Sequence, residues 1–238
     1  MRPLVLVPTY NERDNLRPLV AALMAIDELQ IVIVDDDSPD GTGAEAESIA
    51  ALNHGRVSVL RRSGFRGLGR SYIEGMGAAL RTNATHICQM DADFSHDPAA
   101  LPQLLKAAGA ADLVIGSRYI PGGELRNWPA HRLVLSRFAN WYVRAITRLP
   151  VHDCTSGFRC WTRGLLARLP LDRIVSDGYA FQVEMAWEAH AAGGRIVEVP
   201  ITFVERREGQ SKMSGRVIAE SAALPWRLIA RPRSRPKK

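Results

Sequence analysis

The chain has 238 residues, of which 46% are hydrophobic and 24% charged, a composition that suits one large α/β domain or two small ones. Its three cysteines show neither a CxxC pair nor histidines at metal-ligand spacing, which indicates neither a disulfide framework nor a zinc site, and no apolar run reaches the roughly eighteen residues that span a bilayer. The formal net charge of +6 is concentrated at the C-terminus, where residues 227–238 carry six positive charges and no acid.

Short, β-branched and nearly continuous apolar runs predict buried strands at 3–8, 30–35, 56–60, 86–91 and 112–117. Helical patterns lie between or after these runs, at 15–26, 41–52, 70–81 and 98–109. The alternation predicts an α/β fold whose sheet is mainly parallel, with right-handed crossovers and flanking helices, as in Rossmann-like layer sandwiches.

A less regular half follows residue 119. It begins with a loop that contains glycine and arginine, and it then predicts a long amphipathic helix around 135–149, a helix at 179–194 and a strand at 195–206. No linker or internal repeat divides the chain. We therefore expect one domain over residues 1–215, followed by an amphipathic and basic C-terminal tail at 216–238.

The tail combines basic residues with apolar ones. Leu224, Trp226, Leu228 and Ile229 lie beside the positive charges, and this combination favours contact with a membrane surface. A disordered, solubilising end is the alternative. We expect no nucleic-acid binding, because no basic stretch interleaved with aromatic residues, and no known reading motif, occurs elsewhere in the chain.

Charged residues follow the predicted strands at the point where each strand ends. In a parallel sheet the carboxyl ends of the strands meet at one edge, where ligands collect. The segments there are PTYNE after the first strand, DDDSPDGT after the second, DADFS after the fourth and GSRY after the fifth. Three of the four are acidic and one is cationic, which predicts a site for a metal and an anion.

Asp91 and Asp93 are the candidate metal ligands. In extended backbone, residues i and i+2 point to the same side, so both carboxylates can face one ion, and such hard oxygens suit Mg²⁺ or Mn²⁺. A solvated turn is the alternative. A calcium loop is excluded, because His96 and Pro102 stand where that loop requires glycine and glutamate. DADFS also matches a short motif of haloacid dehalogenase phosphatases, in which Asp91 would be a nucleophile, but that motif usually closes the first strand.

Other polar residues at the same edge predict a nucleotide pocket. Tyr10 and Glu12 are placed to stack on a base or to accept from it, and Asp36 ends the second strand, where an acid commonly meets a ribose hydroxyl. The cations that would bind phosphates are Arg118, Arg206 and Lys212.

Seven motifs between about residue 3 and residue 213 resemble those of the dolichol-phosphate or polyprenol-phosphate mannose synthases. In chain order they are PTYNE, VDDDSPDGT, DADFSHDP, GSRYIPGG with NW, TSGFR, DGYAFQVEM and FVERREGQSKM. These proteins are inverting family 2 glycosyltransferases with the GT-A fold. The resemblance implies transfer of mannose from GDP-mannose to a polyprenyl phosphate with Mg²⁺ or Mn²⁺. It also implies a cytoplasmic protein that is peripheral on the cytoplasmic face of a membrane.

Carried over position by position, the resemblance implies roles for particular residues. Those that line the guanosine nucleotide would be Pro8, Tyr10, Glu12, Val34, Asp36, Asp91 and Ala92. The metal ligands would be Asp91, Asp93 and Ser95, the last being a departure from relatives with glutamine at that position. Phosphates would be bound by Arg118, Arg206 and Lys212, and the acceptor phosphate by Arg132 and Ser136. The catalytic groups would be Asp91, Asp93, Arg118 and Arg206.

The mechanism that this implies needs no general base, because the acceptor is a phosphate oxyanion that is already a nucleophile at pH 7. The metal and the arginines would instead stabilise the departing diphosphate while the acceptor is held in line. The basic tail or a separate membrane protein would anchor the chain. Three alternatives remain open, namely UDP-glucose as the donor, a soluble acceptor, and a nucleotide-sugar binding module without turnover.

Overall fold

A seven-stranded sheet forms the centre of the molecule, with the strand order β3-β2-β1-β4-β7-β5-β8, and a two-stranded sheet of β6 and β9 lies beside it. The structure is a computed structural model that describes residues 1–205 and 215–231, the last range with side chains from residue 222 on. The strands are β1 Pro3–Thr9, β2 Gln30–Asp35, β3 Val57–Arg61, β4 His86–Gln89, β5 Leu113–Ser117, β6 Glu124–Arg126, β7 Arg159–Thr162, β8 Ile196–Pro200 and β9 Thr202–Val204.

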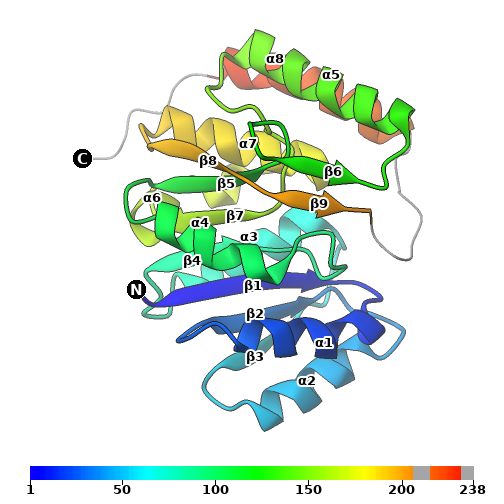
Figure 1. Ribbon diagram of the computed structural model, residues 1–238, viewed down its shortest axis with the longest axis vertical. Coiled ribbons are helices and arrows are strands. Elements are labelled where there is room, and N and C mark those ends of the chain that lie inside the picture. The colour runs from blue at the N-terminus through cyan, green and yellow to red at the C-terminus, as the bar shows by residue number, and fades with distance from the viewer. Residues whose placement is uncertain (206–214, 232–238) are drawn as a thin grey trace.

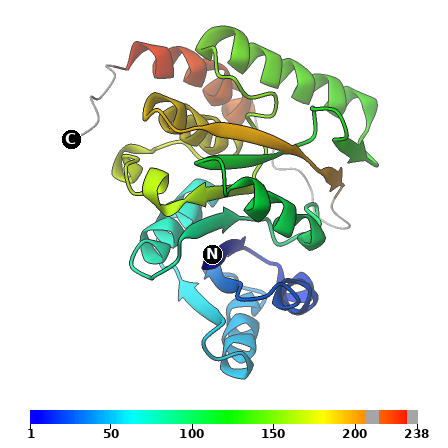
Figure 2. The same cartoon turned by 60° about the vertical axis from the view of Figure 1, so that its left-hand side comes forward.

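Helices cover both faces of the large sheet. In Figure 1, α1, α2 and α4 lie in front of it and α3 and α7 behind it, and Figure 2 shows the same layers from another side. The helices are α1 Arg13–Met24, α2 Thr42–Leu52, α3 Leu68–Ala79, α4 Leu101–Ala107, α5 Ala130–Thr147, α6 Arg163–Leu166, α7 Gly178–Ala191 and α8 Gly215–Ala230. Short 3₁₀ helices occupy Pro98–Ala100 and Leu171–Arg173.

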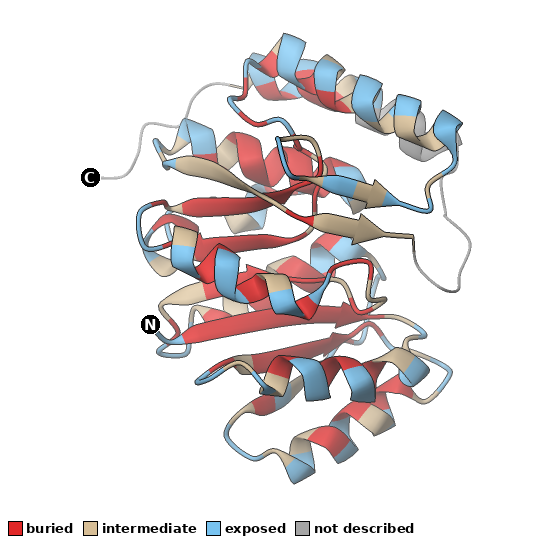
Figure 3. Cartoon of the chain, in the orientation of Figure 1, coloured by how far each residue is buried: buried red, intermediate tan, exposed pale blue. Residues whose placement is uncertain are grey.

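The core consists of two apolar clusters, one on each face of the sheet. One cluster joins β1, β2, β4 and β5 to α3, α6, α7 and the inner sides of α5 and α8, and the other joins the opposite face to α1, α2 and α4. All seven residues of β1 are buried, and the central strands are buried along almost their whole length (Figure 3). Burial on both faces explains why these strands appear in the sequence as continuous apolar runs.

The predicted α/β fold with a mainly parallel, mixed sheet is confirmed. Each of the five predicted strands and four predicted helices of the first half is present, with shifts of a few residues at their ends. The sequence pattern missed two strands, the three-residue β6 and the strand of the large sheet, β7. β7 pairs antiparallel with both β4 and β5, and it comes from the segment DCTSGFRCWTR, where a buried arginine interrupts the apolar pattern.

The predicted strand at 195–206 is two strands in different sheets. β8 pairs with β5 as far as Pro200, where the ring nitrogen has no hydrogen to continue the ladder. The backbone of Ile201 then donates to Ser117 and accepts from Glu124, so the chain passes from one sheet to the other at this residue. β9 runs beside β6 and reaches the edge of the large sheet at which the site lies.

The segment predicted as a tail begins with a helix. Leu224 and Leu228 of α8 are buried in the core cluster, whereas Trp226 and Ile229 remain exposed. Arg231 donates to the buried carboxylate of Glu184 on α7 at 2.6 Å. No helix in the described part of the chain is both long enough and apolar enough to cross a membrane.

Candidate active site

The polar segments predicted to meet at one edge of the sheet do so. The carboxyl ends of β1, β2 and β4 are adjacent because these three parallel strands are neighbours. The antiparallel β7 lies between β4 and β5, so its amino end reaches the same edge and brings the loop before it, residues 153–158, beside the acidic turn that follows β4. The site therefore has a wall that parallel topology alone does not predict.

Asp91 and Asp93 lie in the turn that follows β4, not in the strand itself, because pairing ends at Gln89. The hydroxyl of Tyr72 donates to Asp91 Oδ1 at 3.2 Å, and the backbone N–H of Ser95 donates to Asp93 Oδ1 at 3.0 Å. Burial and the nearby carboxylate of Asp91 raise the pKa of Tyr72 well above its usual value, so Tyr72 stays protonated and acts as a donor. Both carboxylates are thus held in place by the chain.

A small cavity of about 50 Å³ brings the two carboxylates together with the predicted phosphate-binding residues. Its walls come from the turn after β4, the end of β5, the loop before β7, the start of α5, the start of α7, and β9 with the residue that follows it. The lining residues are Asp91, Asp93, Ser95, His96, Arg118, Arg132, Thr155, Gly157, Tyr179, Phe203 and Glu205. Five residues predicted from the sequence thus share one cavity.

Arg118 is held by a buried carboxylate that the sequence analysis did not single out. Its Nε and Nη2 donate to the two carboxylate oxygens of Asp153 at 2.7 Å each, and Nη2 also donates to Thr155. The ion pair raises the pKa of Arg118 and lowers that of Asp153 despite the opposing effect of burial, so both groups are charged. Nη1 donates no hydrogen bond to the described residues, and its two N–H groups are those available to a ligand.

Arg132 and Ser136 lie on the first two turns of α5, close to the same cavity. Arg132 forms an ion pair with Glu205, which follows β9, and its guanidinium lies 4.3 Å from the centre of the Trp128 ring. The hydroxyl of Ser136 bonds to Tyr119 at 2.7 Å. Arg132 therefore faces the cavity with a carboxylate as its partner, whereas Ser136 does not line the cavity.

The predicted nucleotide residues occupy the neighbouring part of the edge. Tyr10 lies beneath the guanidinium of Arg66, which also donates to its hydroxyl at 2.7 Å. Asp36 is buried, forms an ion pair with Arg62 and accepts from the N–H of Gly67 at 2.8 Å. These two residues face the start of α3 and do not line the cavity.

The remaining predicted residues are placed as follows. Glu12 accepts from Asn15 at 2.8 Å at the start of α1. Pro8, Val34 and Ala92 are buried, and the Val34 side chain packs in the core, on a strand that pairs with β1 on one side and β3 on the other. Arg206 and Lys212 lie outside the described residues.

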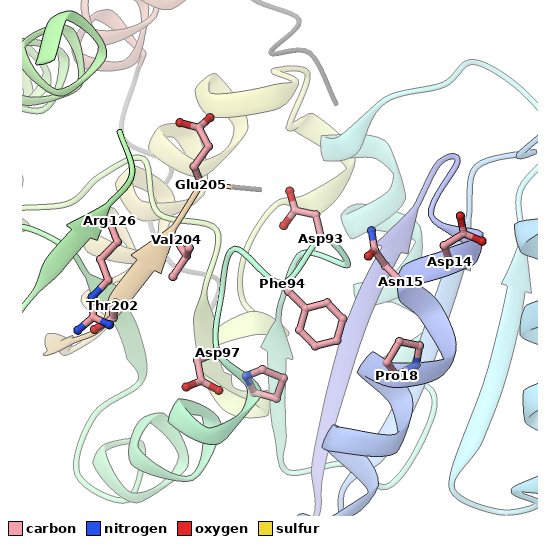
Figure 4. A pocket seen from close by; sticks show the side chains of 11 residues that line it. Asp14, Asn15, Pro18, Asp93, Phe94, Asp97, Arg126, Thr202, Val204 and Glu205 are labelled. Carbon is pink, nitrogen blue, oxygen red and sulfur yellow. The ribbon is translucent and has the colours of Figure 1, made fainter. Parts of the chain in front are cut away.

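A larger groove of about 550 Å³ adjoins the cavity and shares Asp93 and Glu205 with it. Figure 4 shows that α1 forms one side of this groove and β9 the other, with Phe94 and Asp97 between them. Its other lining residues are Asp14, Asn15, Pro18, Pro98, Arg126, Thr202 and Val204.

The oxygen donors of the turn after β4 fit a hard divalent cation. Asp91 and Asp93 supply carboxylates, and Ser95, which is buried but lines the cavity, supplies a hydroxyl. Within the described ranges no three histidine, cysteine or acidic side chains form a complete metal cage. Mg²⁺ and similar ions commonly take only one or two carboxylates from the protein and complete their shell with water and substrate phosphates.

His96 adjoins this turn but is poorly suited to proton transfer. Its ring is buried between Phe158 and Phe203, and burial lowers its pKa, so the imidazole is neutral. Nδ1 lies 3.8 Å from Asp91 Oδ2, beyond hydrogen-bonding distance. Its place between two aromatic rings makes it a packing residue behind the carboxylates.

Six lining residues were missed as individual site residues, namely the packing residues His96 and Phe203 and the four residues Thr155, Gly157, Tyr179 and Glu205. The latter four illustrate the limit of the motifs. Three of them belong to the quoted motifs TSGFR and DGYAFQVEM, and Glu205 belongs to FVERREGQSKM. The motifs indicated these segments, but only the antiparallel insertion of β7 and the turn from β8 to β9 show which side chains reach the cavity.

Comparison with known proteins shows similarity over most of the chain. The glycosyl transferase family 2 model matches residues 4–169. A polyprenol monophosphomannose synthase of Mycolicibacterium smegmatis is 48% identical over 223 residues, which cover 92% of this chain and 84% of the relative. An undecaprenyl-phosphate mannosyltransferase of Micrococcus luteus is 45% identical over 234 residues, covering 97% and 96%.

Solved structures share the fold at lower sequence identity. Glucosyl-3-phosphoglycerate synthase of Mycobacterium tuberculosis, in complex with Mn²⁺, UDP-glucose and phosphoglyceric acid, superposes with a TM-score of 0.68 at 19% identity over 96% of this chain and 77% of that one. A mannosyltransferase of Pyrobaculum calidifontis in complex with GDP-Man and Mn²⁺ gives 0.56 at 19% identity, over 96% and 72%. The GT-A fold expected from the sequence is confirmed.

Proposed function

The chain belongs to glycosyltransferase family 2, and we propose that it transfers mannose, with inversion, from GDP-mannose to a polyprenyl monophosphate. The observation that carries the proposal is the shared cavity, in which Asp91 and Asp93 face Arg118 and Arg132. One space thus offers oxygen ligands for a metal ion beside positive charges for a phosphate. A donor diphosphate and an acceptor phosphate need this combination.

On the donor side, Asp91 and Asp93 would hold Mg²⁺ or Mn²⁺, with Ser95 as a third oxygen donor. When bound, this ion supplies positive charge that stabilises the diphosphate leaving group. The role of the chain is to fix the carboxylates, which Tyr72 and the backbone of Ser95 do by hydrogen bonding.

On the acceptor side, Arg118 and Arg132 would bind the phosphate of the lipid. Arg118 offers Nη1 in a geometry fixed by Asp153, so little conformational freedom is lost on binding. Arg132 would exchange the carboxylate of Glu205 for the phosphate, and Ser136 would act through the Tyr119 hydroxyl. An ionised phosphate oxygen attacks without a general base, and the packing of the His96 ring between Phe158 and Phe203 leaves this histidine no assigned role in proton transfer.

The nucleotide would lie along the ends of β1 and β2. There Tyr10 and Glu12 would face the base, Asp36 the ribose, and Pro8, Val34 and Ala92 would line the pocket through backbone or apolar contacts. Arg206 and Lys212, outside the described residues, are proposed to bind donor phosphates. UDP-glucose is retained as the alternative donor, because a related fold is known in complex with it.

We further propose that the protein works peripherally on the cytoplasmic face of a membrane, where a polyprenyl phosphate resides. The outer face of α5 supports this proposal. Val134, Leu135, Phe138 and Trp141 are exposed on it, and Phe138 packs against Trp141 at 5.7 Å between ring centres. The exposed apolar side chains begin within the same two turns that carry Arg132 and Ser136, so a lipid tail would leave the cavity along this helix.

The positive charge of α5 supports an anionic membrane surface as the partner of its outer face. α5 contains Arg132, Arg137 and Arg144 and no acidic residue, a pattern typical of helices that lie in a membrane interface. The exposed Trp226 of α8 extends the apolar surface, since its indole N–H donates to Tyr142 of α5 at 2.9 Å. The basic tail beyond residue 231 and a separate anchor protein are the other contacts proposed from the sequence.

The test is a transfer assay with purified protein, Mn²⁺, a short polyprenyl phosphate and radiolabelled GDP-mannose or UDP-glucose. Label from GDP-mannose that enters the organic phase, and that disappears when the metal is chelated, supports the proposal. Transfer from UDP-glucose alone would show that UDP-glucose, and not GDP-mannose, is the donor. Binding of either nucleotide sugar without any transfer to lipid would refute the lipid acceptor.

A further inference from the structure

The β3–α3 loop, residues 62–67, holds two of the side chains that are proposed to contact the nucleotide. Its first residue, Arg62, is buried and pairs with the carboxylate of Asp36. The other oxygen of that carboxylate accepts from the N–H of Gly67, the last residue of the loop, at 2.8 Å. The guanidinium of Arg66 lies over the ring of Tyr10 and donates to its hydroxyl at 2.7 Å. The position of the loop therefore affects the orientation of both Tyr10 and Asp36.

Asp177 joins this part of the chain to α7. Its Oδ1 accepts from the backbone N–H of Gly69, in the first turn of α3, at 2.6 Å, and from that of Gly178, the first residue of α7, at 2.8 Å. α3 and α7 lie next to each other behind the large sheet (Figure 1), and one carboxylate thus binds the amino ends of both. A negative charge is favourable at this position, because the first N–H groups of each helix lack partners within the helix.

Two glycines allow the loop and α3 to approach the residues before α7. A β-carbon built on Gly67 would lie 2.3 Å from Asp177 Oδ2, and one built on Gly69 would lie 2.6 Å from the backbone oxygen of Ser176. The backbone of Gly67 is extended, with φ 161° and ψ 136°, a conformation that other residues also adopt. Glycine is therefore needed at position 67 for the close approach and not for an unusual backbone conformation.

We propose that Asp177 is a positioning residue for the sugar nucleotide, which fixes the β3–α3 loop and, through it, Tyr10 and Asp36. The inference rests on the proposed function, in which these two residues contact the base and the ribose. Asp177 is exposed and lies two positions before Tyr179, a residue of the cavity wall. A loop that is already ordered loses less conformational entropy when the nucleotide binds, which raises the affinity for the donor. The competing role for Asp177 is that of a cap for α7 and nothing more.

Two substitutions should weaken donor binding by the same route. Asp177→Ala removes both hydrogen bonds. Gly67→Ala places a methyl group where the carboxylate of Asp177 lies, and the carboxylate can move away because it ends a flexible side chain. We expect each variant to raise the KM for GDP-mannose and the Kd for GDP roughly fivefold, the effect of about one hydrogen bond, with kcat and the acceptor KM unchanged. Asp177→Asn keeps the accepting oxygen and should recover most of the loss.

The double variant shows whether the two residues act together. In an Asp177→Ala background the methyl group of Gly67→Ala meets no carboxylate, so it should cost no further affinity. An equal further loss would contradict the route through Asp177. Thr162→Ala and Gly164→Ala are the matched controls, since Thr162 caps α6 and a β-carbon on Gly164 meets nothing within 4 Å. Both lie at the end of β7 that pairs with the start of β4, away from the site.

A role limited to capping predicts a different result. Asp177→Ala would then lower the melting temperature about as much as Thr162→Ala does and would leave the donor KM and the Kd for GDP unchanged, which would overturn the proposal. If the wild type transfers nothing from GDP-mannose, the proposed function fails, and calorimetry with GDP, GDP-mannose, UDP and UDP-glucose still tests Asp177. A fivefold loss of affinity for whichever of them binds would uphold the positioning role, and equal affinity would refute it. Absence of binding by all four would refute both proposals.

Discussion

The carboxylate of Asp153 holds the guanidinium of Arg118 in a fixed orientation at the wall of the active-site cavity. Two hydrogen bonds of 2.7 Å join them, and the backbone N–H of Arg118 also donates to Asp153 at 3.0 Å. Asp153 is fully buried and Arg118 nearly so. A paired, buried arginine keeps a charge at the proposed acceptor-phosphate site, with only its Nη1 group left for a ligand.

Replacement of this carboxylate should reduce both stability and activity. We expect Asp153→Asn to lower the free energy of unfolding by about 3 kcal/mol, because it leaves a buried guanidinium without a counter-charge. It should also lower kcat/KM through the loss of Arg118 orientation. Thr155→Val removes one hydrogen bond to the same guanidinium and should cost only about 1 kcal/mol. Urea unfolding measures both values, and equal losses would contradict the dominant role of the ion pair.

The same pair predicts how stability depends on acid. Burial opposes ionisation of Asp153, but Arg118 outweighs it and holds the pKa of Asp153 below its usual 3.8. The unfolded chain therefore binds a proton at a higher pH than the folded chain does. The stabilisation is fully present above about pH 5 and is lost as the pH falls below 3.8 toward the lowered pKa. Urea unfolding from about pH 6 to pH 3 should show a shallower loss for Asp153→Asn than for the wild type; parallel curves would refute this.

The sequence predicted the elements with continuous apolar patterns and the site residues that follow them. Asp91, Asp93 and Arg118 were found because strand ends in a parallel sheet meet at one edge. Asp153 and Gly157 were not, because they reach that edge through β7, which runs antiparallel between β4 and β5. Its pattern is broken by Arg159, a residue whose burial no local rule predicts.

The sequence also did not predict which side chains contact one another across the fold. Arg132 was predicted to bind a phosphate, but its ion pair with Glu205 spans 73 positions and depends on the passage of the chain from β8 to β9. Likewise, Leu224 and Leu228 appeared as part of an amphipathic tail, and only the packing of α8 against α5 and α7 shows that they face the core. Long-range contacts of this kind leave no periodic signal.

Loss of one carboxylate from the turn after β4 should abolish turnover through loss of the metal. We expect Asp93→Ala to lower kcat by at least roughly a hundredfold even at saturating Mn²⁺, since the ion stabilises the leaving group. Asp97→Asn is the control. Asp97 lies four positions away and is exposed, its side chain caps the following 3₁₀ turn, and asparagine can replace it as a cap. Initial rates across a Mn²⁺ titration give the answer, and substantial activity of Asp93→Ala at high Mn²⁺ would count against this role.

Glu205 should compete with the acceptor for Arg132. Its carboxylate occupies the guanidinium that the lipid phosphate is proposed to use. Glu205→Gln removes that charge, so we expect the KM for the polyprenyl phosphate to fall about threefold while GDP-mannose binding stays the same. Glu124→Gln, which breaks an exposed pair with Arg126, should change neither value. A rise in the acceptor KM would instead mean that Glu205 positions Arg132 for binding.

The outer face of α5 should decide whether the protein binds membranes. Trp141 is 62% exposed and adjoins Phe138, and an indole of this kind belongs at a lipid interface. We expect Trp141→Glu to reduce co-sedimentation with anionic vesicles several-fold, because it places a negative charge where the bilayer is negative. Leu52→Glu is the matched control, since Leu52 is 72% exposed at the end of α2, remote from this face.

Activity on a short, water-soluble polyprenyl phosphate should be the same in both variants, whereas activity on vesicle-bound acceptor should fall only for Trp141→Glu. Equal vesicle binding by Trp141→Glu and the wild type, together with loss on removal of residues 232–238, would assign the membrane contact to the basic tail instead.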